Sequence, residues 1–141
     1  DESLIAAFQL RDIFDKPMYT LSGGTRQKVS ASLAFLFSPE VLILDEPTAG
    51  LDPLSSELLK AKIRESQAAG KLILITSHII SDLEEICSHV LYLHEGKLKL
   101  FKSASELKAI ADEVQLTKAI TKMMKNNLTS WEKSSPISSL I

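Results

Sequence analysis

The sequence predicts an α/β fold in which a parallel sheet is flanked by helices. Two uninterrupted apolar runs, VLILD and LILITS, are typical of strands that are buried on both faces of a parallel sheet. A helical pattern lies between them, and this strand-helix-strand order is the unit that joins parallel strands. The 141 residues, 45% of them apolar, are enough for one modest core.

Helical periodicity and helix breakers set the elements of the first part of the chain. Pro17 ends the first helix, Pro47 forces a turn after the first strand, and Gly70 caps the third helix. In order we expect a short helix over 4–14, a helix from Thr25 to about Ser38, a strand over 41–45, a helix over 54–69 and a strand over 72–77.

The rest of the chain shows two local signals. Glu95-Gly96 predicts a hairpin turn between two strands, which we expect at the edge of the sheet, and Ser103 with Glu106 has the spacing of a capping box. The serine-rich segment 129–141 is expected to be disordered. In order we expect a short acidic helix over 81–87, two strands in VLYLHEGKLKLF, a helix over 103–110 and a weaker helix over 115–127.

Composition excludes several classes of protein. The 16 basic and 18 acidic residues give a formal charge of −2 without a block of one sign, so no nucleic-acid partner is expected. A single cysteine, Cys87, rules out an internal disulfide framework, and no apolar run approaches the roughly 18 residues of a membrane span. We therefore expect a cytosolic chain. Because it begins with Asp1 and shows no leader pattern, we also expect that its true beginning is missing.

Two adjacent carboxylates follow the first strand. Asp45 and Glu46 are expected at the carboxyl edge of the sheet, where open α/β folds bind ligands. Asp45 suits Mg²⁺ coordination, and Glu46 can orient and deprotonate a water, although such a pair is as often only a solvated loop. His78 follows the second strand and should reach the same edge, where an imidazole can hydrogen-bond a phosphate. A histidine in that position alone is more often a structural loop residue.

The segment LSGGTRQKVS places Ser22, Gly23 and Gly24 directly before a helical pattern. Ser22, with the backbone N–H groups of Gly23 and Gly24, would form an anion site, because unpaired donors and the helix dipole both favour negative charge. Glycine lets the backbone approach the anion without a Cβ, whereas a simple capping turn is the structural alternative. Asp52, in AGLD, is either part of the same ligand-binding edge or the N-cap of the helix that starts at Pro53, and both roles can hold.

The motifs LSGGT, VLILDEP, AGLD and TSH, in this order, resemble those of the ATP-binding cassette (ABC) family of nucleotide-binding domains. The resemblance covers Leu4 to about Lys108 and implies a P-loop NTPase-like sheet flanked by helices. Thr25 stands where the family usually has glutamine, so its contact with nucleotide is in question. The implied roles are the ATP-binding signature for Ser22, Gly23, Gly24 and Thr25, the Mg²⁺-binding Walker B aspartate for Asp45, the catalytic carboxylate for Glu46, the D-loop aspartate for Asp52 and the catalytic switch histidine for His78.

The family's Walker A loop has no counterpart in this sequence. The pattern G-x-x-x-x-G-K-[ST] does not occur, because Gly70-Lys71 and Gly96-Lys97 are both followed by leucine. The resemblance therefore implies an incomplete fold, the carboxyl half of a nucleotide-binding domain that is inactive alone. Its parts would be the end of the helical subdomain with the signature over 1–40, the carboxyl half of the ATPase core over 41–110, a helical extension over 111–128 and a disordered tail over 129–141.

The resemblance further implies an ATP-hydrolysing subunit of an ABC transporter with ATP and Mg²⁺ as cofactors. Such a subunit would dimerise with a second nucleotide-binding domain, identical or not, and drive a separate transmembrane permease from the inner face of the cell membrane. AGLDP resembles the transporter pattern, and a soluble ABC-type ATPase acting on ribosomes or DNA is the alternative. The presence of Glu46 and His78 argues against a degenerate regulatory domain.

Overall fold

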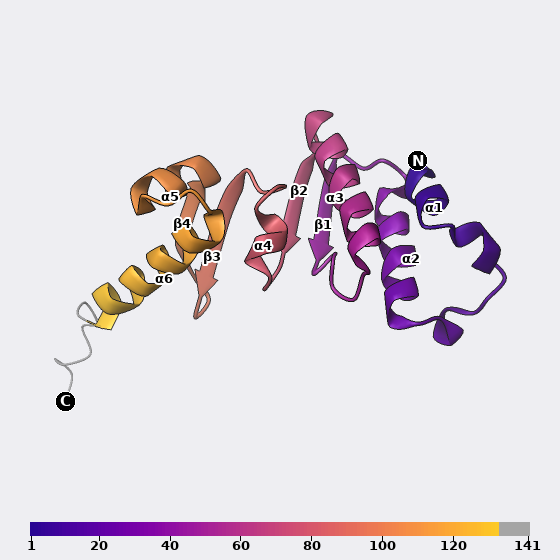
Figure 1. Cartoon of the computed structure of the whole chain (residues 1–141), viewed down its shortest axis with the longest axis horizontal. Coiled ribbons are helices and arrows are strands. Elements are labelled where there is room, and N and C mark those ends of the chain that lie inside the picture. Colours follow the sequence, from indigo (N-terminus) through magenta and orange to yellow (C-terminus); the bar gives the residue numbers. More distant parts are fainter. Residues whose placement is uncertain (133–141) are drawn as a thin grey trace. The chain divides into compact units, whose positions relative to one another are not determined.

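The computed structural model describes residues 1–132, and the side chains of residues 1–125. The chain divides into two compact units, one over Asp1–His78 and one that begins at Ile79, so the division falls inside the predicted 41–110 segment. The elements in chain order are α1 (Ser3–Ala7), η1 (Leu10–Ile13), η2 (Met18–Thr20), α2 (Gly23–Leu36), β1 (Val41–Asp45), α3 (Pro53–Ala68), β2 (Leu72–Thr76), α4 (Ile80–Leu83), β3 (His89–His94), β4 (Lys97–Ser103), α5 (Ala104–Ala111) and α6 (Leu116–Glu132) (Figure 1).

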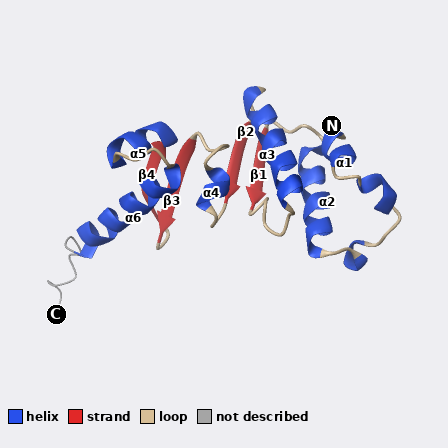
Figure 2. Ribbon diagram, in the orientation of Figure 1, coloured by secondary structure: helices blue, strands red, loops and turns tan. Residues whose placement is uncertain are grey.

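The first unit is built on the predicted strand-helix-strand unit. β1 and β2 pair in parallel, from Val41 opposite Leu72 to Asp45 opposite Thr76, and α3 connects them (Figure 2). Because both strands run in the same direction, their carboxyl ends lie together at one edge of the sheet. The predicted parallel pairing is confirmed.

The helix α3 begins and ends with the capping residues that the sequence predicts. Asp52 caps its start with Pro53 at the first helical position. At its end Gly70 has a φ of 84°, which glycine adopts without steric cost. The N–H of Lys71 then donates to the carbonyl of Ser66 at 3.1 Å, as in a Schellman motif.

The prediction that both strands are buried on both faces is wrong for this structure. Leu42 and Leu44 are 3% and 6% exposed, and they face the core that includes the fully buried Leu59 and Ile63 of α3. The described elements cover only that face of the sheet, and successive residues of a strand point to opposite faces. The alternate apolar residues are therefore 51–72% exposed: Val41, Ile43, Leu72 and Leu74.

The predicted helix over 4–14 is divided into two short helices. α1 ends at Ala7, and the 3₁₀-helix η1 begins at Leu10. Gln9 between them has a φ of 54°, in the left-handed region, and this conformation interrupts a right-handed helix.

The second unit contains a hairpin and two packed helices. β3 and β4 are antiparallel, and Glu95 and Gly96 have φ values of 50° and 69°, as the predicted hairpin turn requires. Among the described strands these two pair only with each other, so they form a separate sheet and not the expected edge of the parallel sheet. The capping box of Ser103 and Glu106 at the start of α5 is confirmed.

Glu84 holds the start of α6 in this second unit. Its carboxylate accepts hydrogen bonds from the N–H groups of Leu116 (2.7 Å) and Thr117 (3.2 Å), and Lys108 lies 2.9 Å away. The Leu116 N–H first, then the lysine and then the Thr117 N–H lower the pKa of Glu84 below its ordinary value. The core that α5 and α6 share includes Leu107 and Leu116, which are fully buried.

The helix α6 is longer than the predicted helix over 115–127. It continues to Glu132 and so includes the beginning of the segment 129–141 for which the sequence predicts disorder. The remainder of that segment, 133–141, lies outside the described residues. Within the part of the chain that is described, no helix is long and apolar enough to cross a membrane.

Candidate active site

The paired strand ends bring three of the predicted residues together. Asp45 is the last residue of β1, and the Glu46 N–H donates to the Thr76 carbonyl at 3.0 Å, so the strand pairing continues one residue further. The Thr76 hydroxyl donates to the Asp45 carboxylate. Thr76 was not singled out by the sequence, because only the strand register places it beside Asp45.

Glu46 and His78 are in direct contact. The His78 N–H donates to Glu46 Oε1 at 2.9 Å, and His78 Nδ1 lies 2.7 Å from the same oxygen. Since a carboxylate only accepts, Nδ1 carries the proton in this contact. The His78 side chain is 72% exposed, so solvent screens the pair and its side-chain contact is weak enough to open.

The backbone of Glu46 is strained. Its φ is 46°, in the left-handed region, although it carries a Cβ and precedes Pro47, which favours an extended conformation. Such a residue costs about 1–3 kcal/mol and persists only where its surroundings hold it. The Ala49 N–H and the side-chain amide of Gln27 both donate to the Glu46 carbonyl, at 3.0 and 3.2 Å.

The predicted anion-binding residues form the start of α2. The helix begins at Gly23, earlier than the expected Thr25, because Ser22 is its N-cap and accepts from the Thr25 N–H at 3.2 Å. The Thr25 hydroxyl lies 2.7 Å from Ser22 Oγ. No described residue accepts a hydrogen bond from the N–H of Gly23 or Gly24. These two donors are available to an anion.

The two glycines differ in their surroundings. A Cβ at Gly23 would meet nothing within 4 Å, whereas a Cβ at Gly24 would lie 2.8 Å from the carbonyl oxygen of Gly50. The start of α2 thus packs against the AGLD loop of the same chain. From the sequence, both positions are expected to need glycine so that an anion can approach the backbone. The structure adds that Gly24 also needs glycine because it packs against Gly50.

Asp52 serves as the N-cap of α3. Its Oδ1 accepts from the Ser55 N–H at 2.9 Å and its Oδ2 from the Ser55 hydroxyl at 2.7 Å, while Lys28 Nζ lies 2.8 Å from Oδ2. The lysine, and then the serine, hold the pKa of Asp52 far below its usual range. The residue therefore stays ionised at all ordinary pH values. Its implied contact with nucleotide remains a prediction.

The site offers oxygen ligands but no complete metal cage. Within residues 1–125 no group of three or more His, Cys, Asp or Glu side chains could hold a metal ion. The Asp45 carboxylate and the Thr76 hydroxyl suit Mg²⁺, which proteins usually bind through one or two carboxylates together with waters and substrate phosphates. The residues present therefore fit Mg²⁺ that arrives with a phosphate ligand.

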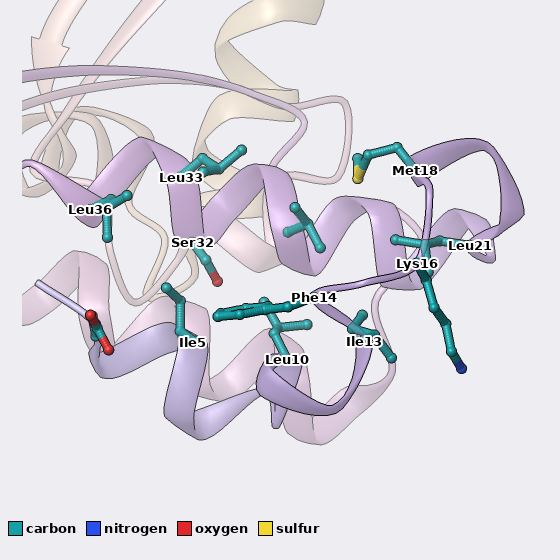
Figure 3. A pocket seen from close by; sticks show the side chains of 12 residues that line it. Ile5, Leu10, Ile13, Phe14, Lys16, Met18, Leu21, Ser32, Leu33 and Leu36 are labelled. Carbon is teal, nitrogen blue, oxygen red and sulfur yellow. The ribbon is translucent and has the colours of Figure 1, made fainter.

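An apolar pocket of about 390 Å³ lies apart from these residues, between α2 and the segment that contains α1 and η1 (Figure 3). Leu10, Phe14 and Leu33 line it, and among residues 1–125, whose side chains are described, Lys16 is the only basic one in its wall. None of the predicted site residues contributes to its wall. The pocket offers no convergent donors for phosphate.

Comparison with known proteins gives a consistent result. The family described as ABC transporter matches residues 2–49. The chain is 33% identical to the ABC transporter ATP-binding protein NatA of Bacillus subtilis (strain 168), over 74% of this chain and 42% of that protein. It is 36% identical to the lipopolysaccharide export system ATP-binding protein LptB of Acidithiobacillus ferridurans, over 75% of this chain and 44% of that protein.

The fold shows the same relationship. A solved structure of the ATP-binding subunit of an ABC transporter matches 86% of this chain and 51% of its own, with a TM-score of 0.78 and 29% identity. The chain spans less than half the length of the curated relatives it matches.

Proposed function

Because the chain belongs to the ABC family of nucleotide-binding domains, we propose that the protein containing it binds and hydrolyses ATP to energise a transporter. The observation that carries the proposal is the cluster at the carboxyl ends of β1 and β2. There Asp45, Glu46 and His78 lie together, and Glu46 Oε1 accepts from His78 at 2.9 Å. A metal ligand, a proton acceptor and an imidazole are the groups that phosphoryl transfer to water uses.

In the proposed mechanism Glu46 accepts a proton from the attacking water. His78 steadies the carboxylate through Oε1 and, when the pair opens, turns its ring toward the γ-phosphate. Asp45 and the Thr76 hydroxyl would hold Mg²⁺, which when bound neutralises charge on the phosphate oxygens.

The start of α2 would bind the γ-phosphate of ATP held by a second nucleotide-binding domain, identical or not. The free N–H groups of Gly23 and Gly24 supply the donors, and the open space at Gly23 lets a phosphate approach. The Thr25 hydroxyl is hydrogen-bonded to the Ser22 hydroxyl, so the part of Thr25 in nucleotide binding is to orient that serine. Asp52 supports the site from the adjoining loop through its contact with Lys28.

The proposed partners follow from this mechanism. Closure of two nucleotide-binding domains on ATP would move a separate transmembrane permease, with the protein peripheral on the cytoplasmic face of the cell membrane. The names of NatA and LptB, an ABC transporter ATP-binding protein and an export-system ATP-binding protein, favour this over a soluble ATPase acting on ribosomes or DNA. The 141 residues contain no Walker A loop, so the chain alone is proposed to be inactive.

The test is ATP hydrolysis by the protein containing this chain, with Glu46→Gln as the informative variant. The amide keeps the shape but cannot act as a base, so turnover should fall by about 10²–10⁴-fold while ATP binding survives. Phosphate release measures turnover, and titration with ATP measures binding. Full turnover in Glu46→Gln would move the role of base to another residue, and an inactive wild-type protein would reject the proposed function.

A further inference from the structure

The side chain of Gln27 leaves α2 and ends on the turn that follows β1. Its Nε2 donates to the carbonyl oxygens of Glu46, at 3.2 Å, and of Pro47, at 3.0 Å. Both contacts are partly buried and join residues about 20 positions apart in the sequence. A primary amide has two N–H donors, so one side chain satisfies both carbonyls.

The turn that Gln27 contacts is the strained one. Glu46 adopts a left-handed φ before a proline, and neither its own Cβ nor the proline ring favours that conformation. The hydrogen bonds from Gln27 fix the two peptide carbonyls on the carboxyl side of Glu46. The position of the Glu46 carboxylate depends on this backbone, because any movement of the turn would carry the Glu46 side chain with it.

Two more contacts hold the same segment against α2. Lys28 Nζ lies 2.8 Å from Asp52 Oδ2, with the lysine side chain only 24% exposed. Gly24 packs so closely on the Gly50 carbonyl that no side chain fits between them. The segment 46–52 therefore contacts α2 at three places along its own length: at Glu46 and Pro47, at Gly50 and at Asp52.

We propose that Gln27 is a positioning residue that holds Glu46 where it can accept a proton from the attacking water. This inference rests on the proposed function and adds a residue to it. It also ties two sites together, because α2 begins with the residues proposed to bind a partner's ATP. A shift of that helix would move the carboxylate that serves the chain's own nucleotide.

The first experiment compares Gln27→Met with wild type in the protein containing this chain. Methionine keeps the length of the side chain and removes the donors, so kcat should fall by about 10- to 100-fold, the effect of a small misplacement of a reacting group. KM for ATP and ATP affinity should stay within about twofold, since ground-state contacts are untouched. Gln27→Lys, which keeps N–H donors, should retain more activity than Gln27→Met.

The matched control is Gln115→Met, the same chemical change at an exposed position of the second unit. It should leave kcat unchanged. If Gln27→Met does not fold, Gln27→Glu gives the same comparison, because it keeps the shape of glutamine and replaces the donor by an acceptor. Wild-type kcat in a folded Gln27→Met or Gln27→Glu protein would overturn the inference while leaving the proposed function intact.

The decisive measurement is the combination with Glu46→Gln. If Gln27 acts through Glu46, adding Gln27→Met to Glu46→Gln should lower the residual single-turnover rate by less than about twofold, because coupled residues are not additive. If Gln27→Met still lowers the single-turnover rate by 10- to 100-fold when Glu46→Gln is present, Gln27 does not act through Glu46. Absence of hydrolysis in the wild-type protein would instead reject the proposed function.

Discussion

Alanine substitutions at the two adjacent glycines of the signature should have opposite effects on stability. Alanine is favoured over glycine in a helix interior by roughly 0.5–1 kcal/mol. At Gly23 and Gly24, the first two residues of α2, this is the upper limit of the gain, and it is common to both positions. At Gly23 the added Cβ meets nothing, so only the gain remains. At Gly24 the Cβ would lie 2.8 Å from the Gly50 carbonyl oxygen, closer than a real Cβ contact allows.

The difference between the two variants therefore isolates the clash. Overpacking that forces the backbone to move costs about 1–3 kcal/mol, so Gly24→Ala should be less stable than Gly23→Ala by about that amount. Urea unfolding of the protein containing this chain, without nucleotide, measures the difference from the two midpoints. Equal midpoints would show that α2 and the AGLD loop do not pack as described.

The same pair of residues decides how the anion site should be tested. A substitution at Gly24 disturbs packing within the chain, so a loss of ATP-driven dimerisation there would not show action on a partner. Gly23→Asp places a carboxylate in open space beside the proposed phosphate site, and like charge should weaken the dimer without changing ATP affinity of the monomer. Light scattering and ATP titration separate these outcomes, and an unchanged dimer would contradict the proposed contact.

Three other predictions concern the chain alone and its caps. The 141-residue chain should show no ATP hydrolysis above background, because it has no Walker A loop, and turnover at the rate of a complete family member would contradict this. Asp52→Ala should lower the midpoint of thermal unfolding of the first unit through loss of the α3 cap, whereas Asp52→Asn should retain most of the cap. The pKa of Glu84 is lowered in the folded protein, so its carboxylate stabilises the fold fully at pH values above its ordinary pKa of 4.5. This stabilisation is lost as the pH falls through the pKa of the folded state. Wild type should therefore lose more stability than Glu84→Gln between pH 6 and pH 3, by about 1 kcal/mol for this partly buried cap. Parallel pH profiles would refute the role of the carboxylate.

Features that depend on neighbouring residues in the chain were predicted from the sequence. The hairpin turn at Glu95-Gly96, the capping box of Ser103 and Glu106, and the strand that ends at Asp45 each follow from a short pattern. The left-handed Gln9 is an exception, because glutamine carries no signal for that conformation.

Among features that depend on distant residues, the parallel pairing of β1 with β2 was predicted, but individual side-chain contacts were not. The contacts of Thr76 with Asp45 and of Gln27 with Glu46 join residues 31 and 19 positions apart. Both residues lie within stretches that the sequence marks, TSH and LSGGTRQKVS, but those patterns give neither residue a contact with the end of β1 or the turn after it. Burial of β1 on both faces was also predicted wrongly, because only the face of Leu42 and Leu44 is buried. An apolar run shows that Ile43 is suited to a buried face, but the exposure of Ile43 depends on which elements lie over the sheet.

The apolar residues exposed on the sheet affect how the 141-residue chain can be handled in solution. Val41, Ile43, Leu72 and Leu74 form a hydrophobic patch on a sheet of two strands, and exposed patches and unpaired strand edges both promote aggregation. Samples of the chain alone should therefore self-associate as concentration rises and should bind a dye such as ANS. Inactive material in the ATPase assay is informative only if light scattering shows that it is monodisperse, so low concentration or a solubilising fusion partner is part of that experiment.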